Sequence, residues 1–127
     1  MLIVVSVFGV AQSAQAAIPA SERAVLINLY NSANGANWIF SSGWNGAPGT
    51  ECSWYGVGCD AAQTTVNRIT LVGDGLSGSL PSLSALPNLQ VFNVNSSDLH
   101  GSIPTLTGLT NLQDFDVGQN YHLTGAI

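Results

Sequence analysis

The chain has 127 residues, of which 46% are hydrophobic and only 7% are charged. Two arginines and no lysine stand against seven carboxylates, so the formal net charge is −5. This length allows one domain at most, and an acidic chain without a basic cluster is poorly suited to bind nucleic acid or an anionic membrane surface.

Residues 1–16 have the pattern of a signal peptide. Leu2–Val10 is an apolar run of about half a membrane span, and Ala14-Gln15-Ala16 forms a small-x-small cleavage site before Ala17. The alternative is a buried apolar strand. We expect an exported protein that meets a membrane only through a segment downstream of residue 127.

The next segment predicts a short helix. Ser21 is a candidate N-cap, and Glu22 places an acid in the first turn. Apolar side chains then recur at helical spacing, at Leu26, Leu29, Tyr30 and Ala33. Asn34-Gly35 is a typical helix end.

The stretch after this helix carries all three tryptophans and both cysteines. An even number of cysteines in an exported chain favours a disulfide between Cys52 and Cys59, with two free thiols or half of a metal site as alternatives. Trp38, Trp44 and Trp54 are either core residues or a sugar-stacking site, and we favour the core.

The remainder of the chain is an internal repeat of 23 residues. Leu89-x-x-Phe92-x-Val94 returns as Leu112-x-x-Phe115-x-Val117, and Ile69 and Leu71 match Phe92 and Val94. The third copy slips to an offset of 24 at Leu123, after an insertion around residues 120–122. The predicted repeats are 66–87, 88–110 and a truncated 111–127.

Each repeat combines a strand with a return segment. Phe92 and Val94 alternate with polar residues, which predicts a strand whose apolar side faces inward. Pro104 disfavours a regular helix in the return, so we expect a short 3-10 or extended segment. Stacked copies can bury the apolar edges that one copy exposes, which makes the fold a solenoid.

These residues resemble the plant-type leucine-rich repeat. The family pattern stands here as Leu89-x-x-Phe92-x-Val94-x-x-Ser97-x-Leu99-x-Gly101-x-Ile103-Pro104. The resemblance implies an α/β repeat: a leucine-rich-repeat solenoid with a parallel β-sheet on its concave face. The family's conserved Asn, which bonds to the backbone of adjacent turns, is Asp74, Ser97 and Asn120 in the three copies, so this ladder of bonds should be weaker here.

The region before the repeats resembles the N-terminal cap of the same family. The matching stretches are Leu29–Trp38 and Cys52–Cys59, and the whole resemblance covers about residues 20–127. It implies a helical, disulfide-bonded cap, which we place at residues 17–65. Such a cap seals the apolar edge of the first coil.

In this family the concave strand face is the usual partner-binding surface. Its predicted residues form three columns, Arg68, Val91 and Asp114, then Thr70, Asn93 and Asp116, then Val72, Asn95 and Gly118. The columns are polar and become acidic toward the C-terminus, which suits a protein or peptide ligand with basic groups. The alternative is that binding takes place beyond residue 127.

Catalytic motifs are lacking, so we expect no enzyme, no cofactor and no metal. His100 and His122 sit in corresponding turns and give only a weak indication of a metal. Asp114 and Asp116 are expected to be solvated rather than catalytic. Asn95-Ser96-Ser97 is a glycosylation sequon, and a glycan there would crowd the predicted face.

The sequence therefore predicts a secreted or cell-surface recognition module that binds a protein or peptide. The alternative is a structural solenoid segment of a larger receptor-like kinase or other enzyme. In that case the partner site or the catalytic domain lies downstream of residue 127.

Overall fold

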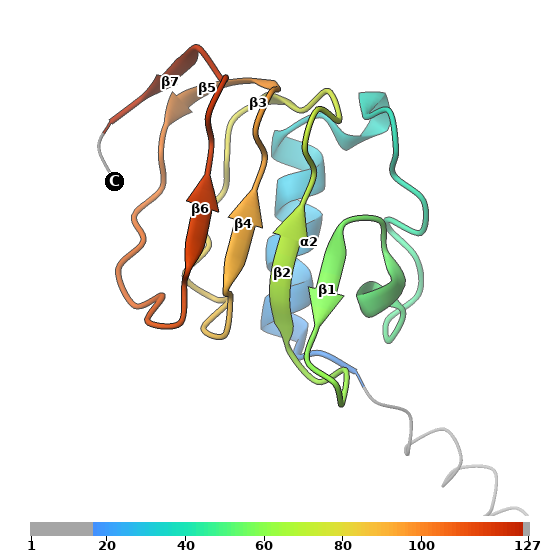
Figure 1. Ribbon diagram of the computed structural model, residues 1–127. Helices are drawn as coiled ribbons and strands as arrows, with labels where there is room; N and C mark the ends of the chain where they lie inside the picture. The colour runs from blue at the N-terminus through green and yellow to red at the C-terminus, as the bar shows by residue number, and fades with distance from the viewer. Residues whose placement is uncertain (1–16, 126–127) are drawn as a thin grey trace, which may run out of the picture.

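The computed structural model describes residues 17–125, so the predicted signal peptide at 1–16 lies outside the described residues (Figure 1). A helix and two 3-10 turns precede or flank the first strand: α2 (Ala20–Ser32), η1 (Gly35–Asn37) and η2 (Glu51–Ser53). The strands are β1 (Val57–Cys59), β2 (Val66–Thr70), β3 (Ser77–Gly78), β4 (Val91–Asn93), β5 (Asp98–Ser102), β6 (Asp114–Asp116) and β7 (His122–Thr124).

Helix α2 begins two residues before the position that the sequence predicted. Its N-cap is Pro19, whose carbonyl accepts hydrogen bonds from the N–H groups of Glu22 and Arg23. The prediction that Ser21 caps the helix is therefore wrong: the fixed φ of Pro19, −59°, already suits a helix start. The helix ends as predicted, because Asn34 adopts the left-handed conformation with φ of 60°.

One sheet holds the strands in the order β1-β2-β4-β6. The three repeat strands are parallel, and their register pairs Ile69 with Phe92 and Phe92 with Phe115. Strand β1 is antiparallel to β2 and occupies the cap side of the sheet, while α2 packs behind it (Figure 1). The sequence-based prediction of a parallel sheet with a 23-residue stagger is confirmed.

A second, smaller sheet was not predicted. It joins β3, β5 and β7 in parallel, at the ends of the turns that follow the main strands. Its register pairs Gly78 with Leu99 and Gly101 with Leu123. In the sequence repeat, Gly78 corresponds to Gly101 and Gly101 to Gly125, so each pairing is shifted by two residues from the repeat. A shift of two keeps each side chain on its own face of the sheet. The remaining return segments are extended with turns, and no described return residue is in a 3-10 helix.

The core runs without a break from the cap into the coils. Trp38, Trp44 and Trp54 are at most 8% exposed, which confirms the prediction that they are core residues. The coils add buried side chains at equivalent places, among them Ile69, Leu71, Leu76, Leu83, Leu86, Leu89, Phe92, Val94, Leu99 and Leu109. The rings of Phe92 and Phe115 stack with centroids 5.6 Å apart.

A disulfide and the contacts of one arginine hold the cap together. The predicted disulfide joins Cys52 to Cys59, with a Cα–Cα distance of 5.6 Å. The side chain of Arg23 forms an ion pair with Glu51 and donates to the carbonyl of Gly46 at 2.8 Å. Its guanidinium also lies 5.2 Å from the ring centroid of Trp54. Because Glu51 is only 2% exposed, this ion pair is largely withdrawn from water.

The position of the family's conserved Asn, called the ladder position below, also stabilises the fold. It is occupied by Asp74, Ser97 and Asn120, and its bonds differ from coil to coil. Oδ1 of Asn120 accepts from Leu99 N at 3.0 Å, while its amide nitrogen donates to the carbonyls of Val94, Val117 and Gly118. Ser97 makes one such bond, from Leu76 N at 3.3 Å. The expected weakening of the ladder is thus visible as a loss of bonds toward the cap.

Replacing Arg23 with Ala should destabilise the fold by about 3 kcal/mol, because a buried carboxylate then loses its cation. Urea unfolding followed by tryptophan fluorescence measures this. Arg68→Ala is the matched control, since Arg68 is exposed, and its effect should stay within about 0.5 kcal/mol. Equal unfolding midpoints for the two variants would contradict the role given to the ion pair.

Replacing Asn120 with Ala should cost about 3 kcal/mol, because several buried backbone groups lose their partner at once. The equivalent change Ser97→Ala removes a single long bond and should cost about 1 kcal/mol. Both values come from the same urea titration. A larger effect at Ser97 than at Asn120 would show that the bond count at this position does not govern stability.

Candidate partner-binding face

The outward side of β2, β4 and β6, with the turns that follow these strands, is called the strand face below. The register places Arg68, Val91 and Asp114 in one row across the strands, and Thr70, Asn93 and Asp116 in the next. The third predicted row lies on the turns, where Gly73 N donates to Asn95 O and Ser96 N donates to Gly118 O, both at 2.9 Å. These three rows are the three columns predicted from the sequence, so the structure brings the residues of each column together. Their role in binding stays a prediction.

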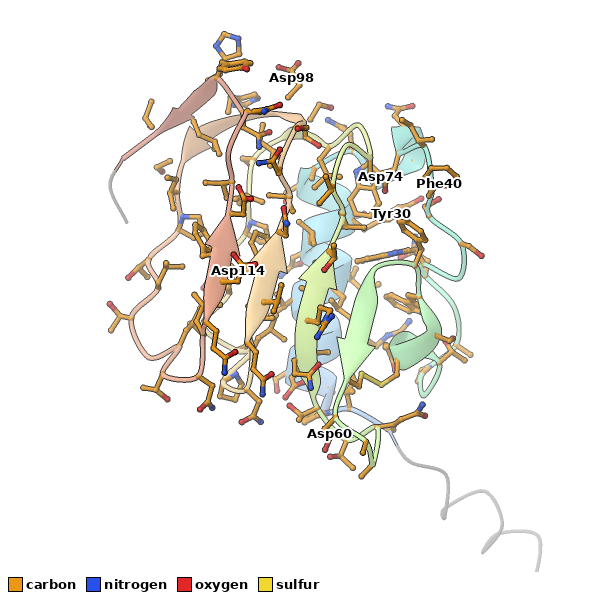
Figure 2. All side chains as sticks on the ribbon, in the orientation of Figure 1. Tyr30, Phe40, Asp60, Asp74, Asp98 and Asp114 are labelled. Atoms are coloured by element: carbon orange, nitrogen blue, oxygen red, sulfur yellow. A yellow bond between two sulfur atoms is a disulfide. The ribbon has the colours of Figure 1, made fainter. Side chains whose placement is uncertain are left out.

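Asp116 is held in place by its neighbours. Its Oδ1 accepts from the amide of Asn95 and from the backbone N–H of Gly118, each at 2.9 Å. The bond from Asn95 and, after it, that from Gly118 lower the pKa of Asp116, so this carboxylate stays ionised in mild acid. Asp114, two residues earlier, is exposed (Figure 2). The C-terminal side of the strand face is thus negative, with one carboxylate already oriented.

Arg68 gives the opposite side of the strand face a positive charge. It is exposed and faces Gly58 of β1 across the sheet. A Cβ at Gly58 would lie only 3.0 Å from the Arg68 Cβ, so the glycine leaves room for this side chain. Among residues 17–125 the one salt bridge joins Arg23 and Glu51, which leaves the charge of Arg68 available to a partner.

The sequon asparagine takes part in this arrangement. The nitrogen of Asn95 that would carry a glycan donates to Asp116, and the Asn95 oxygen accepts from the Ser96 hydroxyl. A glycan at Asn95 would therefore replace a bond that orients Asp116 and would project over the strand face.

Sequence reasoning missed an apolar surface beside the strand face. Its members are exposed large side chains near the cap that no predicted column contained, Ile39 at 65%, Phe40 at 57% and Tyr55 at 40%. The rings of Phe40 and Tyr55 lie 5.5 Å apart. Ile39 and Phe40 occur in a stretch without periodicity, so no sequence signal separated them from the buried tryptophans nearby.

A polar hollow of about 690 Å³ opens at the other end of the strands, where β2 and β4 begin. Its lining is Pro19, Glu22, Asp60, Thr64, Thr65, Asn67, Pro87, Asn88 and Gln90. Glu22 was expected only to favour the helix N-terminus, but its carboxylate accepts from Val66 N and from the Thr65 hydroxyl, each at 2.7 Å. Hydrogen bonds, first of all from Thr64 N, lower the pKa of Asp60.

The two histidines meet, although on strands and not in turns as predicted. His100 of β5 and His122 of β7 are direct neighbours in the register of the second sheet, and both are exposed. Within the described part of the chain, no three His, Cys, Asp or Glu side chains are grouped so that they could hold a metal ion. Nor does any helix of this part have the length and apolar character needed to cross a bilayer.

Comparisons with known proteins agree with this architecture. Residues 19–60 match the family described as leucine rich repeat N-terminal domain. A stretch of 62 residues, 48% of this chain, is 38% identical to the LRR receptor-like serine/threonine-protein kinase RGI5 of Arabidopsis thaliana, of which it covers 6%.

Among solved structures, the LRR ectodomain of the receptor kinase SOBIR1 from Arabidopsis thaliana has a similar fold. The TM-score is 0.63 at 16% sequence identity, over 80% of this chain and 55% of that one. The chain therefore spans a small part of the first relative and about half of the second. The stacked coils and these likenesses agree with the predicted resemblance: the chain has the fold of a leucine-rich-repeat solenoid, and its residues 19–60 are similar to a leucine rich repeat N-terminal domain.

Proposed function

We propose that the chain is an extracellular or cell-surface recognition module that binds a protein or peptide on the strand face. The observation that carries this proposal is the strand face itself. Three parallel strands in register present six of the nine predicted outward positions, and the turns that follow them present the other three. Among the described residues no helix covers this side of the sheet (Figure 1). Such an open, preformed surface suits a macromolecular ligand better than a small apolar molecule, which needs an enclosed pocket.

The charges of the strand face define the partner further. Asp114 and the oriented Asp116 favour a ligand that places a Lys or Arg side chain at the C-terminal side. Arg68 lies on β2, next to Val91 of β4, and favours a ligand that places an acidic group at the cap side of the strand face. The exposed Phe40 and Tyr55 add an apolar area near the cap, and exposed apolar patches of this kind are typical of protein interfaces.

The relatives support an extracellular role. One is a receptor-like kinase and the other is the ectodomain of a receptor kinase. Similarity to these proteins supports the proposal of an extracellular recognition segment.

The second candidate is a structural segment of a larger receptor-like kinase, with the partner site or the catalytic domain elsewhere. The observation that favours it is the small share of the first relative, 6%, that the matched stretch covers. In this case the cap and first coils would only display the coils that follow.

Binding can be tested with a random peptide library panned against the chain, followed by affinity measurement for each enriched peptide. We expect basic peptides that lose at least tenfold in affinity for Asp114→Lys, because an attractive charge becomes repulsive. Asp114 is preferred to Asp116 for this change, since Asp116 also accepts two bonds within the protein.

Thr105→Lys is the matched control. Thr105 is exposed on the return segment between β5 and β6, away from the strand face, and the change introduces the same lysine side chain there. Its affinity for the enriched peptides should equal that of the unchanged protein. Peptides that respond to Thr105→Lys as strongly as to Asp114→Lys would favour general electrostatics and contradict a site on the strand face.

A further inference from the structure

The first coil carries a carboxyl group at the ladder position, where the third coil carries an amide. Asn120 uses its oxygen to accept from one N–H and its nitrogen to donate to three carbonyls. In the 23-residue repeat the equivalent residue of the first coil is Asp74, and the carbonyls equivalent to those of Val117 and Gly118 belong to Leu71 and Val72. An ionised carboxylate has no hydrogen to donate to them.

Asp74 lies at the joint between the cap and the first coil (Figure 2). Its Oδ1 accepts from Phe40 N at 2.6 Å, and its own carbonyl accepts from Ile39 N at 2.9 Å. The residue is only 1% exposed, and its second oxygen, Oδ2, is buried without a hydrogen-bond partner. A buried oxygen that carries negative charge and has no donor is costly.

Within residues 17–125, neither arginine compensates this charge. Both arginines are placed elsewhere: Arg23 pairs with Glu51, and Arg68 faces Gly58 across the sheet. Burial raises the pKa of Asp74, and the hydrogen bond from Phe40 N opposes this only in part.

The titratable groups on the surrounding elements are few. The segment Trp38–Ser41 has none, and helix α2 contributes the phenol of Tyr30. The loop that leads to β1 carries the phenol of Tyr55, and the second coil carries the exposed carboxylate of Asp98. In Figure 2 the labels of Tyr30 and Phe40 lie close to that of Asp74, and Asp98 lies higher in the view, where β5 begins. None of these groups supplies a positive charge.

We propose that Asp74 is a proton-dependent latch between the N-terminal cap and the first coil. In the protonated form, Oδ2 donates its hydrogen to the carbonyl of Leu71 or Val72, as the Asn120 amide does in the third coil, and the joint is closed. In the ionised form, Oδ2 gains solvation only when the turn around residues 72–75 moves to admit water. That movement separates the turn from the Ile39–Phe40 segment, so the exposed apolar residues beside the strand face shift with pH.

The sign of the pH effect follows from the raised pKa. The contribution of the protonated latch is complete below the ordinary value of 3.8 and is lost as the pH rises through the raised value in the folded protein. Between these two values the equilibrium constant for unfolding increases by up to tenfold per pH unit, relative to a variant that cannot ionise at this position.

The test compares the unchanged chain with Asp74→Asn in urea unfolding from about pH 4 to pH 8. Asn is the residue that the third coil uses at the same place, so this variant should fold. We divide the unfolding constant of the unchanged chain by that of Asp74→Asn at each pH. We expect this ratio to rise with pH and then to level off. A ratio that is constant or falls with pH overturns the latch.

Asp98→Asn is the control, because Asp98 is an exposed carboxylate on the next coil and its loss should leave the pH dependence parallel to that of the unchanged chain.

Amide hydrogen exchange of the peptide spanning residues 38–42, corrected for the intrinsic effect of pH, tests the location. It should speed up with rising pH in the unchanged chain and not in Asp74→Asn. Equal pH dependence of this exchange in both proteins overturns the assignment to the joint, and Asp74→Ser, which copies the second coil, provides a second variant without the carboxyl group.

Discussion

The stacking of Ile69, Phe92 and Phe115 in one column governs the architecture of this protein. These side chains are in register on three parallel strands, and the first two are fully buried. Because side chains alternate along a strand, fixing this inward column also fixes which residues face outward. The strand face, the orientation of Asp116 and the second sheet all depend on a repeat that returns the chain to the same place after 23 residues.

The repeat and its inward residues could be predicted from the sequence because they leave a periodic signal. The columns through Arg68 and Thr70 followed from that period alone, and the buried tryptophans followed from the need to seal the first coil. The start of the helix did not follow, because the candidate cap Ser21 and the actual cap Pro19 are close neighbours with comparable local signals. The roles of Glu22, Arg23 and Phe40 depend on partners 28 to 44 residues away, and such contacts leave no local pattern.

The ladder position shows how one fold tolerates different chemistry at equivalent sites. Asn120 satisfies both a donor and several acceptors, Ser97 satisfies one N–H, and Asp74 leaves an oxygen without a partner. The third coil therefore has the most complete set of polar bonds, while the cap joint relies on its aromatic core and on the Arg23–Glu51 ion pair. The most complete set of ladder hydrogen bonds and the aromatic core thus lie at opposite ends of the described chain.

Because β1 is antiparallel to β2, further parallel coils can be added only at the β6 edge of the sheet. Strand β1 lies along the outer edge of β2 and uses the backbone groups that another parallel strand would need on that side. The edge of β6 keeps the parallel register of the coils. Duplication of a repeat unit during evolution can therefore lengthen the solenoid beyond β6 without disturbing the cap. Insertion between β1 and β2 would instead disturb the pairing that joins the cap to the first coil.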